Sequence, residues 1–168
     1  LDNWSVCTLC KRNGRSALMA DIKSPEERSR NMSRIRSKDT KPEVWFRKKL
    51  FERGYRYRKN VSNIPGRPDI WMPKYNTAVF VHGCYWHRHE GCKYAYTPKR
   101  RMDFWTEKFQ RNVERDRVVR NELEEADVRI LVIWECTIRR MLGDETIEAE
   151  GLDEIETFLC SDEGYKER

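Results

Sequence analysis

The order of predicted helices and strands indicates an α/β protein whose central mixed β-sheet has helices on both sides. The apolar run at 129–134 is typical of a strand that is buried on both faces. Two shorter apolar runs, at 69–72 and 77–81, are typical of strands joined by a turn. Amphipathic helices are expected at 40–54 and 101–125. With 168 residues, the chain has room for one domain with a single core.

The first helix is expected to begin at Ser24. The segment Ser24-Pro25-Glu26-Glu27 combines a capping serine, a proline in the first turn and acidic residues at the positive end of the helix dipole. Residues 1–20 show no apolar period and are expected to form a poorly ordered arm, so the main domain is assigned to residues 21–160. Cys7 and Cys10 in the arm have the spacing of half a zinc knuckle, but no second unassigned cysteine pair completes it.

The second helix is expected to run from Thr40 to Gly54. Thr40-Lys41-Pro42-Glu43 forms a capping box at its start, and the glycine ends it. A short strand is expected at 55–58. The side chains predicted to form the apolar face of this helix are Val44, Phe46, Leu50 and Phe51.

Further helices are expected on the carboxyl-terminal side of the cysteine-rich segment. The long helix at 101–125 is amphipathic, and a last helix is expected at 152–159. The segment 161–168 is expected to be a loose tail. The residues of the long helix predicted to point inward are Phe104, Trp105, Phe109, Val113 and Leu123.

The charge of the chain is distributed unevenly. The formal net charge is +6, but residues 1–140 hold 32 Lys and Arg against 18 Asp and Glu, and residues 28–59 hold 13 against 3. Because each phosphate that is neutralised releases condensed counterions, such a body is suited to bind a polyanion. A solvated, charge-rich helical surface explains the charge alone equally well. Without an apolar run long enough to span a bilayer or a charged-then-apolar leader, a soluble intracellular protein is expected.

Residue types that bind metal ions are concentrated in one short segment. Cys84, His89 and Cys92 lie within nine residues, after a predicted strand, and Cys136 follows the strand at 129–134. A structural zinc ion takes four sulfur or nitrogen ligands, so three local ligands require a distant one, and Cys136 is the best candidate. Without a secretory signal, metal binding explains these cysteines better than disulfides do. Buried free cysteines with incidental histidines are the alternative.

Asp69 is the candidate ligand of a catalytic magnesium ion. It stands in Gly66-Arg67-Pro68-Asp69, at the start of a predicted strand, where a carboxylate can hold Mg²⁺, which prefers oxygen ligands. Pro-Asp before a strand is also common turn chemistry. The PD-(D/E)xK nucleases place a second acid and, two residues later, a lysine on the adjacent strand, but here Val81 and Gly83 occupy these positions. This departure argues against an ordinary restriction enzyme.

His87 is the candidate general base. A loop pinned by zinc through Cys84 and His89 would fix the position of His87 between them. An imidazole that titrates near neutral pH can accept a proton from an attacking water, while a metal ion stabilises charge on the phosphate. The alternative makes His87 the zinc ligand and leaves His89 free.

Six short strings occur in order between about residues 21 and 142. They are Ser37-Lys38-Asp39-Thr40-Lys41-Pro42-Glu43, Gly66-Arg67-Pro68-Asp69, Phe80-Val81-His82-Gly83-Cys84-Tyr85-Trp86-His87, Phe104-Trp105, Asn112-Val113-Glu114-Arg115-Asp116 and Trp134-Glu135-Cys136. Together they resemble the very-short-patch repair (Vsr) endonucleases. Residues 1–20 lie outside the family's pattern.

This resemblance implies a restriction-endonuclease-like fold and a Mg²⁺-dependent DNA endonuclease that nicks one strand. The nick is expected 5′ to the thymine of a T·G mismatch left by deamination of 5-methylcytosine, where it starts very-short-patch repair. The implied partners are double-stranded DNA containing the mismatch and other repair proteins. The resemblance further implies a monomer in the bacterial cytoplasm, associated with the nucleoid and with no membrane.

The resemblance also implies roles for individual residues. Asp69 matches the metal-binding aspartate, Val81 the residue that contacts Mg²⁺ through its backbone carbonyl, and His87 the catalytic histidine. Glu43 and His82 match residues near the cleaved phosphate, although the capping box also explains Glu43. The residues that match the structural zinc ligands are Cys84, His89, Cys92 and Cys136.

Tyr85, Trp86 and Trp105 match aromatic residues that wedge into the base stack beside the mismatch. A mispaired step costs little to unstack, and aromatic faces replace the lost stacking at roughly 1–3 kcal/mol per base. A place in the helix core also explains Trp105. Three further residues are expected to contact DNA: Met32, Lys108 and Asn112.

Two other functions remain open. A homing or restriction-type endonuclease of the same fold would cut intact duplex at a longer site. The Tyr85-Trp86 wedge favours mismatch recognition instead, and the short arm offers little room for an added sequence-reading domain. A zinc-stabilised DNA-binding module without chemistry would need neither Asp69 nor His87.

Overall fold

The computed structural model describes residues 24, 26–27, 30, 33 and 38–168 of the chain, which divides into two compact units at residues 36 and 37. In the first unit, residues 26–27, 30 and 33 are helical. The Glu27 N–H donates to Ser24 Oγ (3.2 Å), and the Ser24 N–H donates to Glu27 Oε2 (2.9 Å). This reciprocal cap confirms the predicted helix start at Ser24. The arm at 1–20 and Met32 lie outside the described residues.

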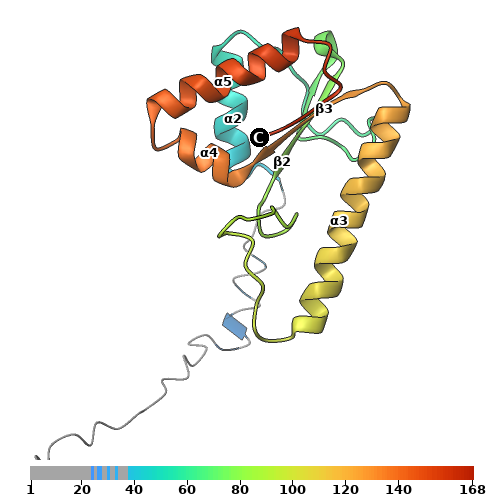
Figure 1. Cartoon of the computed structure of the whole chain (residues 1–168), viewed down its shortest axis with the longest axis vertical. Helices are drawn as coiled ribbons and strands as arrows, with labels where there is room; N and C mark the ends of the chain where they lie inside the picture. Colours follow the sequence, from blue (N-terminus) through green and yellow to red (C-terminus); the bar gives the residue numbers. More distant parts are fainter. Residues whose placement is uncertain (1–23, 25, 28–29, 31–32, 34–37) are drawn as a thin grey trace, which may run out of the picture. The chain divides into compact units, whose positions relative to one another are not determined.

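The second unit is built on a four-stranded mixed sheet with the order β1-β2-β3-β4 (Figure 1). Its strands are β1 (Ile70–Met72), β2 (Thr77–His82), β3 (Arg129–Trp134) and β4 (Tyr165–Glu167). β1 runs antiparallel to β2, whereas β2 and β3 are parallel, as are β3 and β4. The predicted mixed sheet and its first three strands are confirmed.

Helices cover both faces of this sheet, as predicted. The helical elements are α2 (Lys41–Glu52), the 3-10 turn η1 (Pro73–Tyr75), α3 (Met102–Glu125), α4 (Glu135–Met141) and α5 (Glu145–Cys160). α2, α4 and α5 lie on one side, and α3 lies on the other (Figure 1). Among the helices that the structure describes, none has the length and apolar character needed to cross a bilayer.

Strand β3 separates two apolar clusters. Leu131 and Ile133 pack in the cluster that contains residues of α2, α4 and α5, and Ile130 and Val132 pack with Leu123 of α3. This burial on both faces is what the continuous apolar run predicted. The larger cluster consists of Phe46, Leu50, Ile70, Met72, Val79, Leu131, Ile133, Ile138, Met141, Leu152, Ile155, Phe158 and Leu159.

Several side chains expected in the core are exposed. Val44 and Phe51 of α2 are 47% and 55% exposed, and Phe104 and Val113 of α3 are 39% and 44% exposed. A helix of 24 residues is about 36 Å long, whereas a strand of six residues spans about 20 Å. The first part of α3 therefore extends past the sheet (Figure 1), and only Phe109 and Leu123 of this helix are buried.

The remaining differences lie in the short elements. The expected strand at 55–58 is reduced to one bridge between Arg58 and Trp71. The expectation of a loose tail after Ser161 is wrong, because β4 pairs with the free edge of β3. α4 was not expected at all. α5 begins seven residues earlier than predicted, where the Asp144 side chain accepts from the N–H groups of Thr146 and Ile147.

Candidate active site and metal centre

One edge of the sheet gathers the predicted site residues. β2 and β3 are parallel and in register from Thr77 to His82, so both end at this edge, and Cys84 and Cys136 follow directly. β1 is antiparallel to β2 and therefore begins at the same edge, with Asp69 immediately before it. The topology of the sheet thus brings together residues that lie up to 67 positions apart in the sequence.

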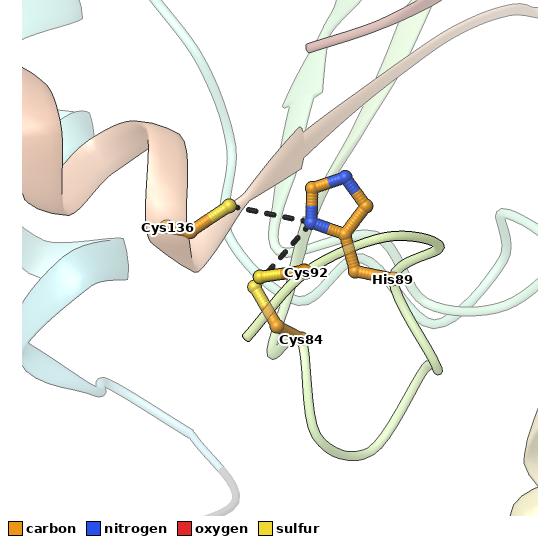
Figure 2. A group of neighbouring side chains, drawn as sticks. All are labelled: Cys84, His89, Cys92 and Cys136. Carbon is orange, nitrogen blue, oxygen red and sulfur yellow. Dashed lines mark hydrogen bonds between the residues drawn. The ribbon is translucent and has the colours of Figure 1, made fainter. Parts of the chain in front are cut away.

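A Cys₃His cluster lies beyond the ends of β2 and β3 (Figure 2). The ligand atoms of its members, Cys84, His89, Cys92 and Cys136, all lie within 4.8 Å of one another. His89 Nδ1 is 3.3 Å from the Cys136 sulfur and 3.6 Å from the Cys84 sulfur. His87 is not a member of this cluster. Three thiols and an imidazole in this arrangement could hold a metal ion.

The Cys84 thiol is protonated when no cation is near it, and a protonated thiol is not a metal ligand. Burial raises the pKa of the Cys84 thiol to about 12, and the neighbouring Cys136 thiol contributes in the same direction. Only the thiolate binds a metal ion, so a bound cation would have to displace this proton. Metal binding at this cluster is therefore coupled to the release of the Cys84 proton.

Asp69 is attached to the end of β2. Its Oδ2 accepts a hydrogen bond of 2.8 Å from the backbone N–H of Val81. Burial raises the pKa of Asp69 from 3.8 to about 6, and the charge of Glu43 acts in the same direction. The Val81 N–H, Arg47 and His87 oppose this shift. A cation bound near the Asp69 carboxylate would stabilise its ionised form and lower its pKa.

His82 and His87 form a stacked pair beside Asp69. Their ring centroids are 3.9 Å apart, with an angle of 9° between the planes. His87 Nδ1 lies 2.5 Å from Asp116 Oδ2 on α3. Burial lowers the pKa of His82 to about 3, and the charge of His87 acts in the same direction, so His82 is neutral at pH 7. His87 thus has a fixed ring with a carboxylate partner, as a general base requires.

Asp116 is a site residue that was not predicted by itself; it ends the string Asn112-Val113-Glu114-Arg115-Asp116. It follows Asn112 by four residues, so both side chains lie on one face of α3. Asn112 Nδ2 donates to the backbone carbonyl of Trp86 (3.1 Å), and Asp116 pairs with His87. The spacing of four residues was the sequence feature that could have pointed to Asp116. Two polar side chains one helical turn apart can contact the same neighbouring segment.

Glu43 lies in the first turn of α2 and is only 6% exposed. The Thr40 hydroxyl donates to Glu43 Oε1 (2.7 Å) and accepts from the Glu43 N–H (3.5 Å). The carboxylate therefore contacts the hydroxyl of its capping residue, and it also lines the cleft described below. One turn later, Arg47 is buried and paired with Asp39.

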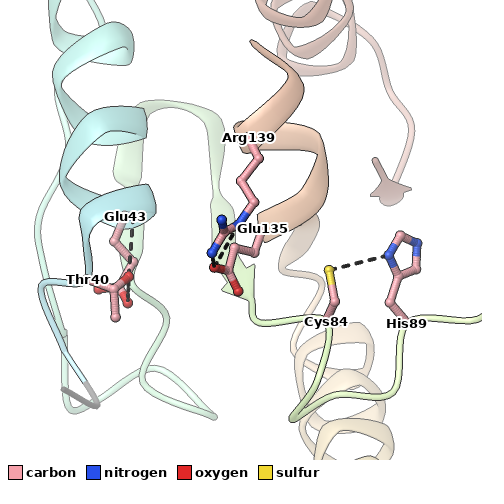
Figure 3. A network of polar contacts seen from close by, with 6 residues as sticks. All are labelled: Thr40, Glu43, Cys84, His89, Glu135 and Arg139. Carbon is pink, nitrogen blue, oxygen red and sulfur yellow. Dashed lines mark hydrogen bonds and ion pairs between the residues drawn. The ribbon is translucent and has the colours of Figure 1, made fainter. Parts of the chain in front are cut away.

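Two further polar pairs accompany the Thr40–Glu43 pair (Figure 3). Arg139 donates twice to Glu135 Oε1, with distances of 2.6 and 3.1 Å, in the first turns of α4. Cys84 contacts His89 in the loop after β2. Glu135 is also near the loop backbone, since its Oε2 would lie 3.7 Å from a Cβ added to Gly83.

A cleft of about 690 Å³, lined by both acidic and basic side chains, opens onto these residues. It is lined by the predicted residues Glu43, Asp69, Val81, His82 and His87, together with Asp116. Its other charged lining residues are mostly cationic: Lys38, Arg67, Arg115, Arg117, Arg120 and Glu167. A concave site that combines carboxylates, histidines and guanidinium groups is suited to hold a phosphodiester.

An aromatic cluster lies between the 84–97 loop and the first part of α3. The Tyr85 ring centroid is 5.0 Å from that of Trp86, 5.8 Å from that of Trp105 and 5.1 Å from that of Phe109. Lys108 Nζ lies 5.2 Å from the centroid of the Trp86 ring. Tyr85, Trp86 and Trp105 are each partly exposed. Trp105 therefore lies in this cluster rather than in either core cluster of the sheet.

Residues 20–93 match the profile of the family described as "DNA mismatch endonuclease Vsr". Three relatives extend the match. The type II nicking enzyme V.NmeAIP of Neisseria meningitidis serogroup A is 47% identical over 72% of this chain and 86% of its own length. The DNA mismatch endonuclease Vsr of Escherichia coli K12 is 38% identical over 86% and 90%. The type II nicking enzyme V.XorIIP of Xanthomonas oryzae pv. oryzae is 41% identical over 71% and 88%.

The chain belongs to the Vsr family. Its coverage of the Escherichia coli relative extends over 145 residues, well beyond the 20–93 segment. The family membership predicted from the six strings is therefore confirmed. Each of the three relatives is named as an endonuclease or as a nicking enzyme.

Proposed function

We propose that this protein is a Mg²⁺-dependent DNA endonuclease with the restriction-endonuclease-like fold, and that it nicks one strand 5′ to the thymine of a T·G mismatch. The observation that supports this most strongly is the placement of Asp69 and the stacked His82–His87 pair in one cleft that arginine and lysine side chains also line. The Vsr relatives support the class of reaction, since they are named as mismatch endonucleases or nicking enzymes.

The residues around Asp69 fit a hard divalent cation. The carboxylate is held beside the end of β2, and burial together with the charge of Glu43 raises its pKa. Asp69 and the backbone carbonyl of Val81 would hold Mg²⁺, which accepts oxygen ligands and keeps several waters. When bound, the ion stabilises negative charge that develops on the phosphate.

His87 would accept the proton of the attacking water. With Nδ1 protonated and donating to Asp116, the lone pair of Nε2 is available for this proton. The Asp116 carboxylate then stabilises the imidazolium that forms. His82 is neutral and stacks on the other ring, so it holds His87 in place without adding a second charge. Glu43 would orient water near the cleaved phosphate.

The cleft and the aromatic cluster would contact different parts of the DNA, the cleft its phosphates and the cluster its bases. Lys38, Arg67 and Arg115 would contact phosphates, which position the duplex without reading its sequence. Tyr85, Trp86 and Trp105 would replace base stacking at a step that is opened, and a mispaired step costs least to open. Lys108 beside the ring of Trp86 and Asn112 against its backbone would support this wedge.

The Cys₃His cluster would hold a structural Zn²⁺. Four protein ligands leave no position open for chemistry, so the ion would fix the loop that carries Trp86 and His87. The non-catalytic alternative explains the zinc site and the basic surface equally well. It does not explain why a buried carboxylate and a His–Asp pair face the same cleft.

A nicking assay tests the proposal. Two duplexes of one sequence, identical except for a single T·G in place of C·G, are incubated with Mg²⁺ and the wild-type protein. We expect the mismatched duplex to be nicked and the matched duplex to stay intact. Asp69→Ala and addition of a chelator are expected to abolish the nick. Absence of any nick with the wild-type protein, or a rate that is unaffected by Asp69→Ala, would refute the assignment.

A further inference from the structure

A continuous column of aromatic rings links the Cys₃His cluster to the histidine pair. The Trp134 ring lies flat against that of His89, with centroids 4.1 Å apart and 3° between the planes. The rings of Trp134 and His82 are in an edge-to-face arrangement, with centroids 5.4 Å apart and 70° between the planes. His82 in turn stacks on His87 at 3.9 Å. Trp134 is therefore the side chain that separates, and contacts, a candidate zinc ligand and a candidate catalytic pair.

The place of Trp134 in the sheet produces this contact. It is the last residue of β3, and its register partner on the parallel strand β2 is His82. Neighbouring residues in register on parallel strands point to the same face, so the two rings meet. Trp134 is only 6% exposed and belongs to the cluster on the α3 face.

The carboxyl-terminal strand fixes the indole in this orientation. Trp134 Nε1 donates to Glu167 Oε1 (2.6 Å), and the Tyr165 hydroxyl donates to the other oxygen of the same carboxylate (2.6 Å). The backbone is tied as well: the Trp134 N–H donates to the Arg168 carbonyl (2.7 Å), and the Arg168 N–H donates to the Val132 carbonyl (3.0 Å). Glu167 of β4 thus holds the Trp134 side chain, and Arg168, which follows β4, holds its backbone.

We propose that Trp134 is a positioning residue for the His82–His87 pair and that Glu167 of β4 locks it in place. This inference rests on the proposed endonuclease function. Trp134 is proposed to act on the histidines rather than on the phosphate. It acts by holding His82, and through His82 the face of His87, while Asp116 holds only the Nδ1 edge of His87.

The physical reason is the precision that proton transfer requires. A hydrogen bond to Asp116 fixes one point of the His87 ring and leaves the ring free to tilt about it. A flat contact against His82 removes this tilt, provided that His82 cannot itself move. His82 is held by its edge-to-face contact with Trp134 and by Phe80, whose ring centroid is 5.9 Å away. A displacement of about 1 Å at a reacting group costs on the order of 10²-fold in rate.

Four variants test this inference. Trp134→Phe keeps an aromatic ring but loses the indole N–H and the larger edge. Glu167→Ala removes the acceptor of that N–H, whereas Glu167→Gln retains an oxygen that can accept it. Trp71→Phe is the matched control, because Trp71 is a tryptophan of β1 that packs on the same apolar cluster and makes no ring contact with the histidines among the described residues.

The expected pattern separates positioning from general destabilisation. In single-turnover assays on a T·G duplex with Mg²⁺, Trp134→Phe is expected to lower the rate constant by about tenfold or more, and Glu167→Ala by about threefold. Trp71→Phe is expected to remain near wild type, and Glu167→Gln is expected to lose less rate than Glu167→Ala. DNA affinity is expected to stay within about threefold in every variant, because phosphate contacts carry most of it.

NMR of the histidine rings provides a readout that does not depend on activity. The ring resonances of His82 and His87 are expected to shift and broaden in Trp134→Phe and Glu167→Ala, and to stay in place in Trp71→Phe. Equal loss of rate in Trp71→Phe and Trp134→Phe, or unchanged histidine resonances in Trp134→Phe, would overturn the inference. If Trp134→Phe fails to fold, the comparison of Glu167→Ala with Glu167→Gln tests the inference, because Glu167 is exposed and its substitution is tolerated more easily. If the wild-type protein nicks no mismatched DNA, the proposed function fails, and the NMR comparison still decides the positioning role.

Discussion

The carboxylate of Asp69 accepts a 2.8 Å hydrogen bond from the backbone N–H of Val81, so a residue that precedes β1 is held against the end of β2. The antiparallel pairing of Ile70 with Val79 brings the two segments together. This hydrogen bond uses Oδ2 of the carboxylate, so Oδ1 could bind a cation. Asp69 is therefore both a structural and a candidate catalytic residue, and the two roles are separable by substitution.

Asp69→Asn is expected to abolish nicking while sparing the fold and DNA binding. An amide oxygen can still accept from the Val81 N–H, but a neutral side chain is a poor ligand for Mg²⁺. We expect the single-turnover rate to fall by about 10³-fold or more. The affinity for a T·G duplex, measured by fluorescence anisotropy, is expected to stay within about threefold. Equal losses of binding and cutting would show that Asp69 acts only in the structure.

The affinity of this site for divalent cations is expected to fall as the pH is lowered through about 6. Burial raises the pKa of Asp69 to about 6, and only the ionised form binds a cation. Affinity is therefore full above this pH and declines about tenfold per unit below it. Titration with Mn²⁺, followed by electron paramagnetic resonance between pH 5 and 8, measures this dependence.

Glu43→Gln is the control for this titration. Its charge contributes to the raised pKa of Asp69, so its removal is expected to move the midpoint to lower pH. A midpoint near 4 in the wild-type protein would show that Asp69 is not the group that competes with the cation.

Asp116→Asn is expected to slow nicking on the order of 10²-fold without weakening DNA binding. The amide can still contact His87 Nδ1, but it can no longer stabilise a positive charge on the imidazole, and it permits the other tautomer. Single-turnover rates and affinities on the same T·G duplex measure the two effects separately. Asp103→Asn, an exposed acid in the first turn of the same helix, is the matched control. A wild-type rate for Asp116→Asn would remove His87 from the role of general base.

Cys136→Ala is expected to release one zinc ion per chain and to lower the melting temperature by about 10 °C or more, since the binding energy of a structural zinc ion is folding energy. Zinc content by mass spectrometry and thermal unfolding measure these changes. Cys160→Ala is the matched control, because this thiol is exposed and lies outside the cluster. A wild-type protein that is folded, metal-free and unchanged in melting temperature would contradict the zinc assignment.

Periodicity and capping predicted the elements that carry most of the buried apolar surface. Each of these predictions depends on a contiguous stretch of residues. They are the strand at 129–134, the helix capped by Thr40 and the long helix at 101–125. β4 could not be predicted in this way. Tyr165, Lys166 and Glu167 have no apolar pattern, and they form a strand because the edge of β3 offers unpaired backbone groups.

Exposure along α2 and α3 was also beyond local reasoning. Val113 follows the apolar period of α3, yet it is 44% exposed because α3 is longer than the sheet. Phe51 follows the period of α2, yet it is 55% exposed, with the Arg56 guanidinium over its ring. The contacts of the candidate site fall in the same class. The meeting of Asp116 with His87 and of Trp134 with His82 depends on how α3 and β3 lie against the loop, which no local pattern specifies.

The most direct test of the account is a map of the cut on the two duplexes that differ only in T·G against C·G. Each strand is labelled at its 5′ end in turn, and wild-type and Trp86→Ala proteins are compared under single-turnover conditions, with Phe51→Ala as an exposed aromatic control on the opposite side of the sheet. We expect one cut, at the phosphate 5′ to the mispaired thymine, which Trp86→Ala loses and Phe51→Ala retains. Cutting of both strands, equal rates on the matched duplex, or a wild-type rate for Trp86→Ala would contradict it.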